Sequence, residues 1–308
     1  GIGSLSPGTT YYYCAIVSSA EGTAFGAVQQ FTTASAATAT TSAASSITST
    51  SATIRGAGNP NSAAAQGWFR YAATDPGSCN DTFGARAPYS GYVNLGAGSV
   101  SLPFSQSLSG LTPGTKYYFC TIASNSYGTG YGSVQTFTTP AMAPTVSTSG
   151  ATNLTRTTAV LTGYGVPGGD ATTGWFRYAT ASPGTCNDTF GTRAPTMGGS
   201  NLGAGTGGVN FQQAISGLAP ATTYYYCALA SNSMGSVWGS VSSFITPAAP
   251  TATTTAATSI TTNSAQLNGS GNPNRANATG WFRYAATNPG TCDDKFGSRA
   301  PTSGGSPL

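Results

Sequence analysis

A repeat of 106 to 107 residues runs through the chain and constrains its fold more than any other feature. One tryptophan and two cysteines recur at this spacing. Three full periods would need slightly more than the 308 residues of the chain, so it holds nearly three units that are cut out of phase. The recurring residues are Trp68, Trp175 and Trp281; Cys14, Cys120 and Cys227; and Cys79, Cys186 and Cys292.

The phase of the repeat predicts four segments. Residues 1–33 are the C-terminal half of a unit, 34–140 and 141–247 are two full units, and 248–308 are the N-terminal half of another. The joints between units are short and contain proline. Because such connectors are stiffer than Gly/Ser linkers, they favour an extended rod.

Each unit contains a Pro-led turn that runs into an aromatic strand. In the first full unit this segment is Leu111-Thr-Pro-Gly-Thr-Lys-Tyr117-Tyr-Phe-Cys120. Aromatic and β-branched residues after a turn favour a β-strand. The tyrosine that follows the turn is placed to bond the preceding backbone, as in the tyrosine corner of immunoglobulin-like sandwiches. The tyrosines at this position are Tyr11, Tyr117 and Tyr224.

This segment and the two that follow it resemble the end of a bacterial fibronectin type III domain. The pattern of that family is Leu-x-Pro-Gly-Thr-x-Tyr, then an Asn-x-x-Gly turn, then Phe-Thr-Thr. Here the turn is residues 125–128 in one unit and 232–235 in the next, and the last strand begins at Phe31, Phe137 or Phe244. The resemblance implies an all-β fold of tandem immunoglobulin-like sandwiches, in an extracellular surface or filament protein.

Composition restricts the class of function. Only 6% of the residues are charged, 11% are aromatic, and the formal net charge is +4. Without a basic run, nucleic acid is a poor candidate partner. No window of eighteen apolar residues predicts a membrane-spanning helix. The chain has no histidine, the commonest general base near neutral pH, so we expect no enzyme activity and no cofactor.

The strand Gly-Trp-Phe-Arg-Tyr recurs near the middle of each unit, and we expect its tryptophan to anchor the two sheets of the core. The following loop carries the first cysteine of the unit, an aspartate two residues later and an arginine five residues after that. A calcium site would need more carboxylates. We therefore expect a turn that is held by an Asp–Arg pair, and an arginine of the strand that stacks on aromatic rings. The aspartates are Asp81, Asp188 and Asp294; the loop arginines are Arg86, Arg193 and Arg299; and the strand arginines are Arg70, Arg177 and Arg283.

The two cysteines of a full unit lie 41 residues apart, one in the loop and one on the late strand. If Tyr117 and Phe119 point inward, alternation places Cys120 on the outer face, where the loop would be stapled. Singly spaced cysteines without histidine argue against zinc. We predict disulfides, and hence an oxidising extracellular compartment, with reduced buried thiols as the alternative. The predicted pairs are Cys79 with Cys120 and Cys186 with Cys227.

Cys14 and Cys292 lie in the two half units and lack a partner in their own segment. Three arrangements satisfy them: a longer array that continues both halves, a head-to-tail polymer with a disulfide at each joint, or closure of one chain into a ring. Stiff joints disfavour the ring. We favour the polymer, since a contact between different surfaces that does not close makes a filament.

Glycans are the other expected partner. Five Asn-x-Ser/Thr sequons could accept N-linked sugars. The tyrosine runs and Trp238 suggest a carbohydrate-binding face as an alternative to the filament, in a spacer or adhesive module of a larger secreted adhesin or polysaccharide-degrading enzyme. The sequons begin at Asn80, Asn153, Asn187, Asn268 and Asn277.

Overall fold

The computed structural model describes all residues, 1–308. Every regular element in it is a β-strand, and no helix is present that is long and apolar enough to cross a membrane. The chain divides into two compact bodies, and each contains one full repeat unit and one terminal segment. The first body comprises residues 1–142 with 168–170, and the second comprises 143–167 with 171–308. Below, the first and the second unit are the two full repeat units.

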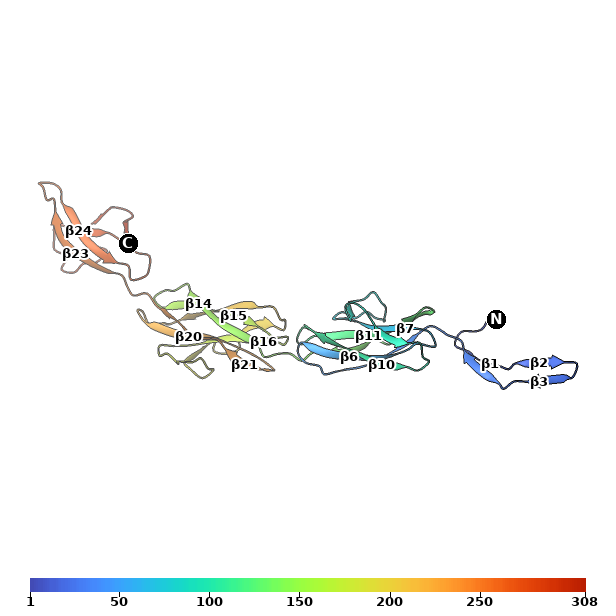
Figure 1. The fold of residues 1–308 in the computed structure, drawn as a ribbon. Helices are drawn as coiled ribbons and strands as arrows, with labels where there is room; N and C mark the ends of the chain where they lie inside the picture. The colour runs from blue at the N-terminus through green and yellow to red at the C-terminus, as the bar shows by residue number, and fades with distance from the viewer. The chain divides into compact units, whose positions relative to one another are not determined.

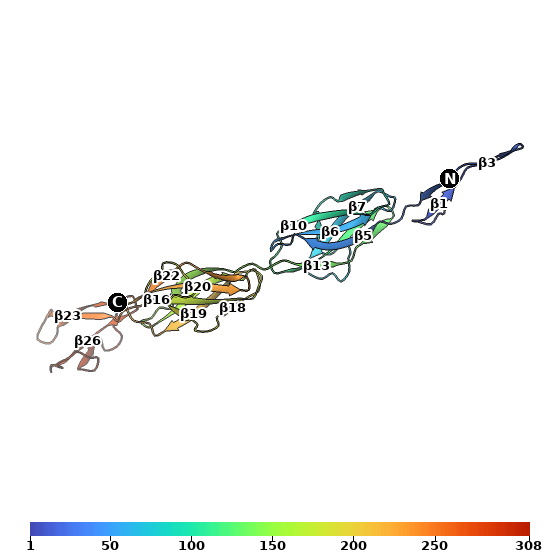
Figure 2. The ribbon, with the colours of Figure 1, turned by 90° about the horizontal axis from the view of Figure 1, so that it is seen from below.

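The first unit contains a complete β-sandwich. One sheet has the order β10-β6-β5, and these strands lie side by side in Figure 2. The other has the order β12-β11-β7-β8, with β13 also pairing β11 and β9 pairing β7. The strands β7 and β11 lie over β6 and β10 (Figure 1). The three-stranded sheet consists of β5 (Thr38–Ser45), β6 (Ser51–Asn59) and β10 (Leu102–Ser109). The facing sheet consists of β7 (Ala65–Ala72), β8 (Ala85–Ala87), β9 (Val93–Gly96), β11 (Lys116–Asn125), β12 (Gly128–Tyr131) and β13 (Gln135–Thr138).

Alternation along the central strands decides what fills this sandwich. On β11, Tyr117 and Phe119 point between the sheets and pack with Ile54 of β6 and Phe69 of β7. Cys120 and Ile122 alternate with them and belong to a separate cluster on the outer face. Both faces of β11 are therefore buried, which requires something to cover the outer side of an antiparallel sheet.

The second unit repeats this architecture with the sheet orders β14-β15-β19 and β17-β16-β20-β21; β18 pairs β16 and β22 pairs β20. Its core again contains a phenylalanine of the central strand, Phe176, in one cluster with Tyr224 and Tyr226. Its three-stranded sheet consists of β14 (Thr145–Thr152), β15 (Thr158–Val166) and β19 (Val209–Ser216). Its other sheet consists of β16 (Thr172–Ala179), β17 (Thr192–Ala194), β18 (Ser200–Gly203), β20 (Thr223–Asn232), β21 (Gly235–Trp238) and β22 (Ser242–Ile245).

The two ends of the chain form only small, separate sheets. At the N-terminus, β1 (Thr10–Tyr13) pairs β4 (Gln29–Thr32), and β2 (Ile16–Ser19) pairs β3 (Gly22–Phe25). At the C-terminus three further two-stranded sheets follow. They pair β23 (Thr251–Thr258) with β24 (Gln266–Asn272), β25 (Thr279–Gly280) with β28 (Ser306–Pro307), and β26 (Phe282–Tyr284) with β27 (Ser298–Ala300).

The Pro-led turn closes in the same way in every copy. In the first full unit the hydroxyl oxygen of Tyr117 accepts a hydrogen bond of 2.9 Å from the backbone N–H of Thr112. Tyr224 accepts the same bond from Ala219, and Tyr11 accepts it from Ser6 at 2.8 Å. This contact is a tyrosine corner. With two facing antiparallel sheets per full unit, the chain is a tandem of fibronectin type III-like β-sandwiches.

Candidate functional site

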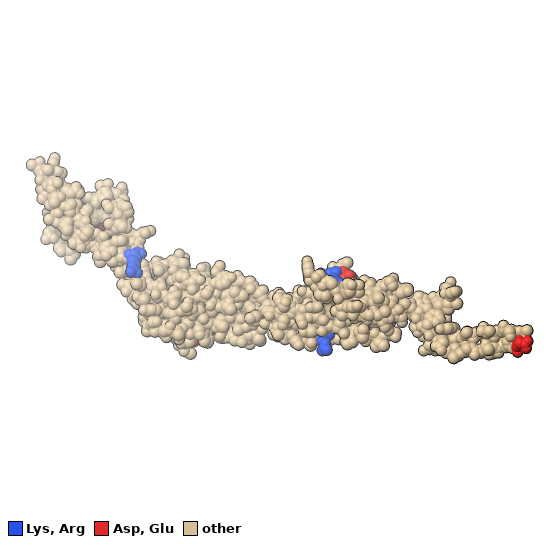
Figure 3. Space-filling view, in the orientation of Figure 1, with Lys and Arg blue, Asp and Glu red and all other residues tan.

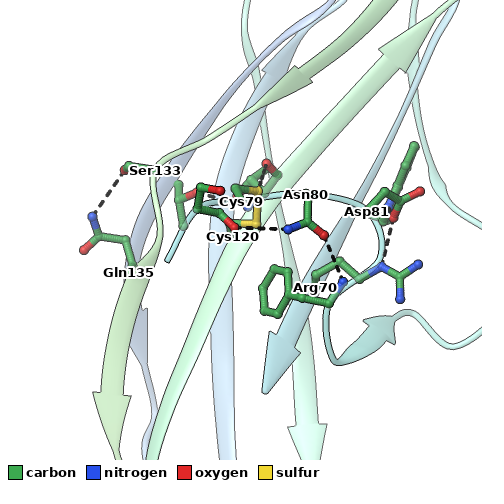
Figure 4. The surroundings of a disulfide bond; sticks show 12 residues. Arg70, Cys79, Asn80, Asp81, Cys120, Ser133 and Gln135 are labelled. Atoms are coloured by element: carbon green, nitrogen blue, oxygen red, sulfur yellow. Dashed lines mark hydrogen bonds and ion pairs between the residues drawn. A yellow bond between two sulfur atoms is a disulfide. The ribbon is translucent and has the colours of Figure 1, made fainter. Parts of the chain in front are cut away.

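A disulfide-stapled loop covers the outer face of each complete sandwich. Cys79 is bonded to Cys120 of β11, and Cys186 is bonded to Cys227 of β20, each pair 41 residues apart in sequence. Figure 4 shows the first bond where the loop crosses the strand. The loop thus supplies the cover that the buried outer face of β11 requires.

Trp68 lies under this loop, which corrects the expectation that the three tryptophans anchor the two sheets. It packs with Cys120, Ile122 and the loop residue Phe83, and its neighbour Phe69 fills the space between the sheets. The physical reason is the two-residue period of a strand, since adjacent residues point to opposite faces. Trp175 lies in the equivalent outer cluster of the second unit. Trp281 occupies the same repeat position in the C-terminal segment.

The expected roles of the two arginines are exchanged. Asp81 pairs with Arg70 of the strand, whose Nε lies 2.9 Å from Oδ1, and not with Arg86 of the loop. The guanidinium of Arg86 instead stacks over the Trp68 ring, 4.8 Å from its centroid. Oδ1 of Asp81 also accepts a hydrogen bond of 2.8 Å from the Trp68 indole Nε1–H. We call these four residues the tryptophan clamp.

The tryptophan clamp is present in all three copies. In the second unit the Asp–Trp and Asp–Arg distances are 2.9 and 3.1 Å, and in the C-terminal segment they are 2.8 and 3.1 Å. The loop arginine lies 4.8 Å from the ring centroid in every copy. The second and third clamps consist of Trp175, Asp188, Arg177 and Arg193, and of Trp281, Asp294, Arg283 and Arg299.

The third clamp forms without a disulfide and without a facing strand. Cys292 is an exposed free cysteine, and Trp281 is 41% exposed, compared with 8% for Trp68. The hydrogen bonds that Trp281 and Arg283 donate to Asp294 hold the pKa of its carboxyl below the ordinary value of 3.8. The loop therefore takes its shape from local hydrogen bonds and charge, independently of the disulfide.

Two of the sequon asparagines have a structural role in the same loop. Oδ1 of Asn80 accepts hydrogen bonds from the backbone N–H groups of Thr82 and Phe83, at 2.9 and 3.0 Å. In the third copy Asp293 replaces this asparagine and accepts the equivalent bonds from Lys295 and Phe296. Asn187 bonds Thr189 in the same manner. The turn thus requires a side-chain oxygen here, which asparagine or aspartate supplies.

The remaining three sequons lie elsewhere. Asn153 and Asn277 are exposed, while the Asn268 amide donates hydrogen bonds to the Ala256 carbonyl oxygen and to Thr258 Oγ1. Groups of three or more His, Cys, Asp or Glu side chains that could hold a metal ion are absent from the 308 residues. A hollow of about 500 Å³ beside β6 and β10 has Arg55 as its single ionisable lining residue. Charged atoms are sparse on the face shown in Figure 3.

The two terminal segments expose counterparts of residues that the complete units bury. Ile16 corresponds to Ile122, and these side chains are 61% and 0% exposed. Leu308 corresponds to Leu95, with 47% and 2%. Ile2, Tyr13, Val17 and Trp281 are also exposed and have buried counterparts. The other exposed large hydrophobic residues of these segments have counterparts that are exposed or half-buried, and they are Tyr12, Phe25, Val28, Ile260 and Tyr284. The same repeat positions are thus exposed in the terminal segments and buried in the complete units.

A groove lies on the inner side of the C-terminal segment. Its volume is about 350 Å³, and its lining comes from three sources. Thr254 comes from β23, Gly269 and Gly271 come from β24, and Phe282 and Leu308 come from the strands and chain that follow. In the complete units, the equivalent inner face contacts β11 or β20, which are the counterparts of β1 and β2.

No protein-family model and no curated protein matches the chain. Among solved structures, 198 chains match. One of them is described as "Crystal structure of chicken CNTN1 FN1-FN3 domains", with 15% sequence identity and a TM-score of 0.27, and the match covers 79% of each chain. At this identity and TM-score the similarity carries no information about function.

Proposed function

We propose that this chain is a structural protein of an extracellular filament or stalk. The observation that supports this most is the complementarity of its two terminal segments. Each exposes apolar residues whose counterparts are buried in a complete unit, among them Tyr13 and Val17 in the N-terminal segment and Trp281 and Leu308 in the C-terminal segment. The role is mechanical, with no catalytic step, and the sandwiches resist unfolding because each buries its own core.

An extracellular location agrees with the chemistry of the chain. Two disulfides staple the complete units, and disulfides persist in oxidising compartments and are rare in reducing ones. An all-β fold of this kind with disulfides is typical of extracellular domains. The low content of charged residues gives no support for a nucleic-acid partner.

In the filament, the N-terminal segment of one copy joins the C-terminal segment of the next. The two contacting surfaces are different, so each copy offers one of each and the contact repeats without closing. Association buries the exposed apolar side chains of both segments, and this is the main driving force. The strand edges of the small terminal sheets, which are open to other chains, are paired in the same step.

A disulfide between Cys14 and Cys292 makes the joint covalent. Both thiols are exposed, and their counterparts are bonded in the complete units. In the reaction, the two thiols lose two protons and two electrons to the disulfide of a small molecule or a thiol oxidase. One S–S bond forms at the joint, and the S–S bond of the oxidant becomes two thiols.

The test is denaturing electrophoresis of the oxidised protein, with and without reductant, beside light scattering of the native protein. We expect a ladder in steps of the 30.7 kDa chain that collapses to one band on reduction. Cys14→Ser or Cys292→Ser should each abolish the ladder and leave non-covalent oligomers in light scattering.

A chain that stays monomeric by light scattering and runs as one band near its own mass in both lanes would contradict the filament. The two disulfides within the complete units also make the unreduced chain migrate faster, so a monomer that runs faster before reduction than unreduced Cys14→Ser would instead show closure of the chain on itself. In either case the terminal segments would not join separate copies.

A glycan-binding or adhesive module is the second candidate, favoured by exposed aromatic rings on the complete units. Tyr89 is 94% exposed and Trp238 is 49% exposed, and sugar rings stack on such side chains. This candidate predicts retention on an insoluble polysaccharide that Trp238→Ala or Tyr89→Ala reduces. Equal retention of these variants and the unmodified chain would contradict it.

A further inference from the structure

We propose that residues 12–18 of one copy add as an antiparallel strand to residues 279–285 of a second copy, in a fixed register that places Ile16 opposite Trp281. This inference rests on the proposed head-to-tail filament and specifies its joint. The partner is a second copy of this chain, and the docking surface is the strand that carries the third tryptophan clamp.

The register comes from the two complete units, which agree with each other. On β11 and β7, Ile122 lies opposite Trp68 and Ser124 lies opposite Gln66. On β20 and β16 the same positions pair Leu229 with Trp175 and Ser231 with Thr173. Shifted by the repeat, these pairs become Ile16 with Trp281 and Ser18 with Thr279.

Both terminal segments are interrupted at the positions that this pairing would join. The strand β11 runs unbroken through ten residues, but its N-terminal counterpart stops between β1 and β2, at Cys14 and Ala15. The strand β7 is also continuous, but its C-terminal counterpart stops between β25 and β26, at Trp281. Each strand lacks its neighbour where it breaks, and the register places the two breaks next to each other: Cys14 and Ala15 come opposite Arg283 and Phe282, and Trp281 comes opposite Ile16.

The receiving surface is already shaped. The clamp around Trp281 has the distances of the complete units, although its ring is still exposed. Ile16 would therefore cover a ring whose orientation is fixed. Such preorganisation lowers the entropy cost of association. The same loop holds Cys292 on the outer face, where Cys14 would arrive opposite Arg283.

The inner faces are complementary as well. In the complete units the backbone N–H of Thr121 or Ala228 donates a 3.0 Å hydrogen bond to a threonine of the facing sheet, Thr41 or Thr148. The counterparts in the joint are the N–H of Ala15 and Oγ1 of Thr254. Thr254 lines the groove of the C-terminal segment, so the groove presents the acceptor that the arriving strand needs.

A glycine that recurs in every copy supports the same contact with the threonine of the facing sheet. A Cβ atom on Gly132 would lie 2.4 Å from Thr41 Oγ1, and Gly239 meets Thr148 in the same way, so these positions exclude a side chain. The N-terminal segment keeps a glycine there, Gly26, which meets only the backbone and Cβ of Ala15. A facing sheet, with Thr254 at the contact, would explain why this position also has no side chain.

The register is tested by cysteine cross-linking between two preparations of the full chain, both with Cys14→Ser and Cys292→Ser. One carries Ser18→Cys and the other carries Thr279→Cys, so that a bond between them joins two copies. A matched third preparation carries Ala278→Cys, whose side chain would point to the opposite face of the strand. After equal mixing and oxidation with oxidised glutathione, we expect at least about tenfold more mixed dimer with residue 279 than with residue 278.

Light scattering of the chain with only the two serine substitutions separates this inference from the proposed filament. Oligomers with strong cross-linking at 279 and weak cross-linking at 278 support both. Oligomers with equal or absent cross-linking at the two positions overturn the register and leave the head-to-tail contact. A monomer without cross-linking overturns both. Circular dichroism of each variant checks that the sandwiches are folded.

Discussion

The indole Nε1–H of Trp68 donates a hydrogen bond of 2.8 Å to Oδ1 of Asp81, thirteen residues later in the chain. The same carboxylate oxygen accepts a hydrogen bond from Nε of Arg70 on the strand that carries the tryptophan. One aspartate thus ties the start of the loop to the sheet that the loop covers. Since the third copy forms the same bonds without a disulfide, the clamp shapes the loop and the disulfide fastens it.

Replacing the aspartate of the clamp should destabilise its unit. In Asp81→Ala, the indole N–H of the buried Trp68 loses its acceptor, and an unsatisfied buried donor costs about 1–3 kcal/mol. Urea unfolding followed by tryptophan fluorescence measures the change. Asp75→Ala is the matched control, because it removes the same charge from the same loop without touching the clamp. Equal losses in both variants would contradict the role of the clamp.

The disulfide of the first unit should contribute more than any single hydrogen bond. Because the bonded cysteines are 41 residues apart, the chain-entropy model gives a loss of about 4 kcal/mol in the Cys79→Ala/Cys120→Ala variant. Chemical denaturation that resolves the two units should show the first transition shifted and the second unchanged. A shift of both transitions would mean that the units do not unfold independently.

Stability of the second unit should fall at alkaline pH. Burial raises the pKa of Tyr226 above its ordinary value of 10.0, and burial also raises that of Tyr178. A group whose pKa is raised on folding contributes stability below its unfolded pKa, and this contribution is lost as the pH rises through the folded value. The contribution of these two tyrosines to the unfolding free energy should therefore be constant below about pH 9 and decrease above about pH 10.

Tyr226→Phe is the variant that checks this dependence. It should weaken the alkaline loss of stability and cost about 1 kcal/mol at neutral pH, since the Tyr226 hydroxyl donates a hydrogen bond to the Ser149 carbonyl oxygen. The first unit has Phe119 at the same position and serves as the internal comparison. An alkaline loss that is unchanged in the variant would assign it to other groups.

Replacing Ala221 by glycine should stabilise the Pro-led turn of the second unit. Ala221 has a φ of 51°, in the left-handed region, where the other two copies have Gly8 and Gly114 with φ of 65° and 62°. A left-handed alanine costs about 1–2 kcal/mol, and the added unfolded-state freedom of glycine offsets part of this. We expect Ala221→Gly to gain about 0.5–1 kcal/mol in thermal or urea unfolding. Gly8→Ala should not show such a gain.

The repeat and the turn chemistry determined much of this fold. The spacing of tryptophans and cysteines defines the unit, because a tandem array must bury the same positions in each copy. The two-residue period of a strand then assigns Cys120 to the outer face once Tyr117 and Phe119 point inward. These are local consequences of backbone geometry, and they can be read along one strand.

Partner choice across strands was decided only by the tertiary structure. Sequence reasoning paired Asp81 with the nearest arginine, Arg86, whereas the register of β7 with the loop brings Arg70 to the carboxylate and lays Arg86 on Trp68. Trp68 was placed in the main core because it is large, yet the pleat turns it outward under the loop. Such contacts depend on which segments meet in space, and a carboxylate or an indole is chemically satisfied by more than one neighbour. The sequence determines the alternation of each strand, and the tertiary structure selects the partners, because pairing joins residues far apart in the chain.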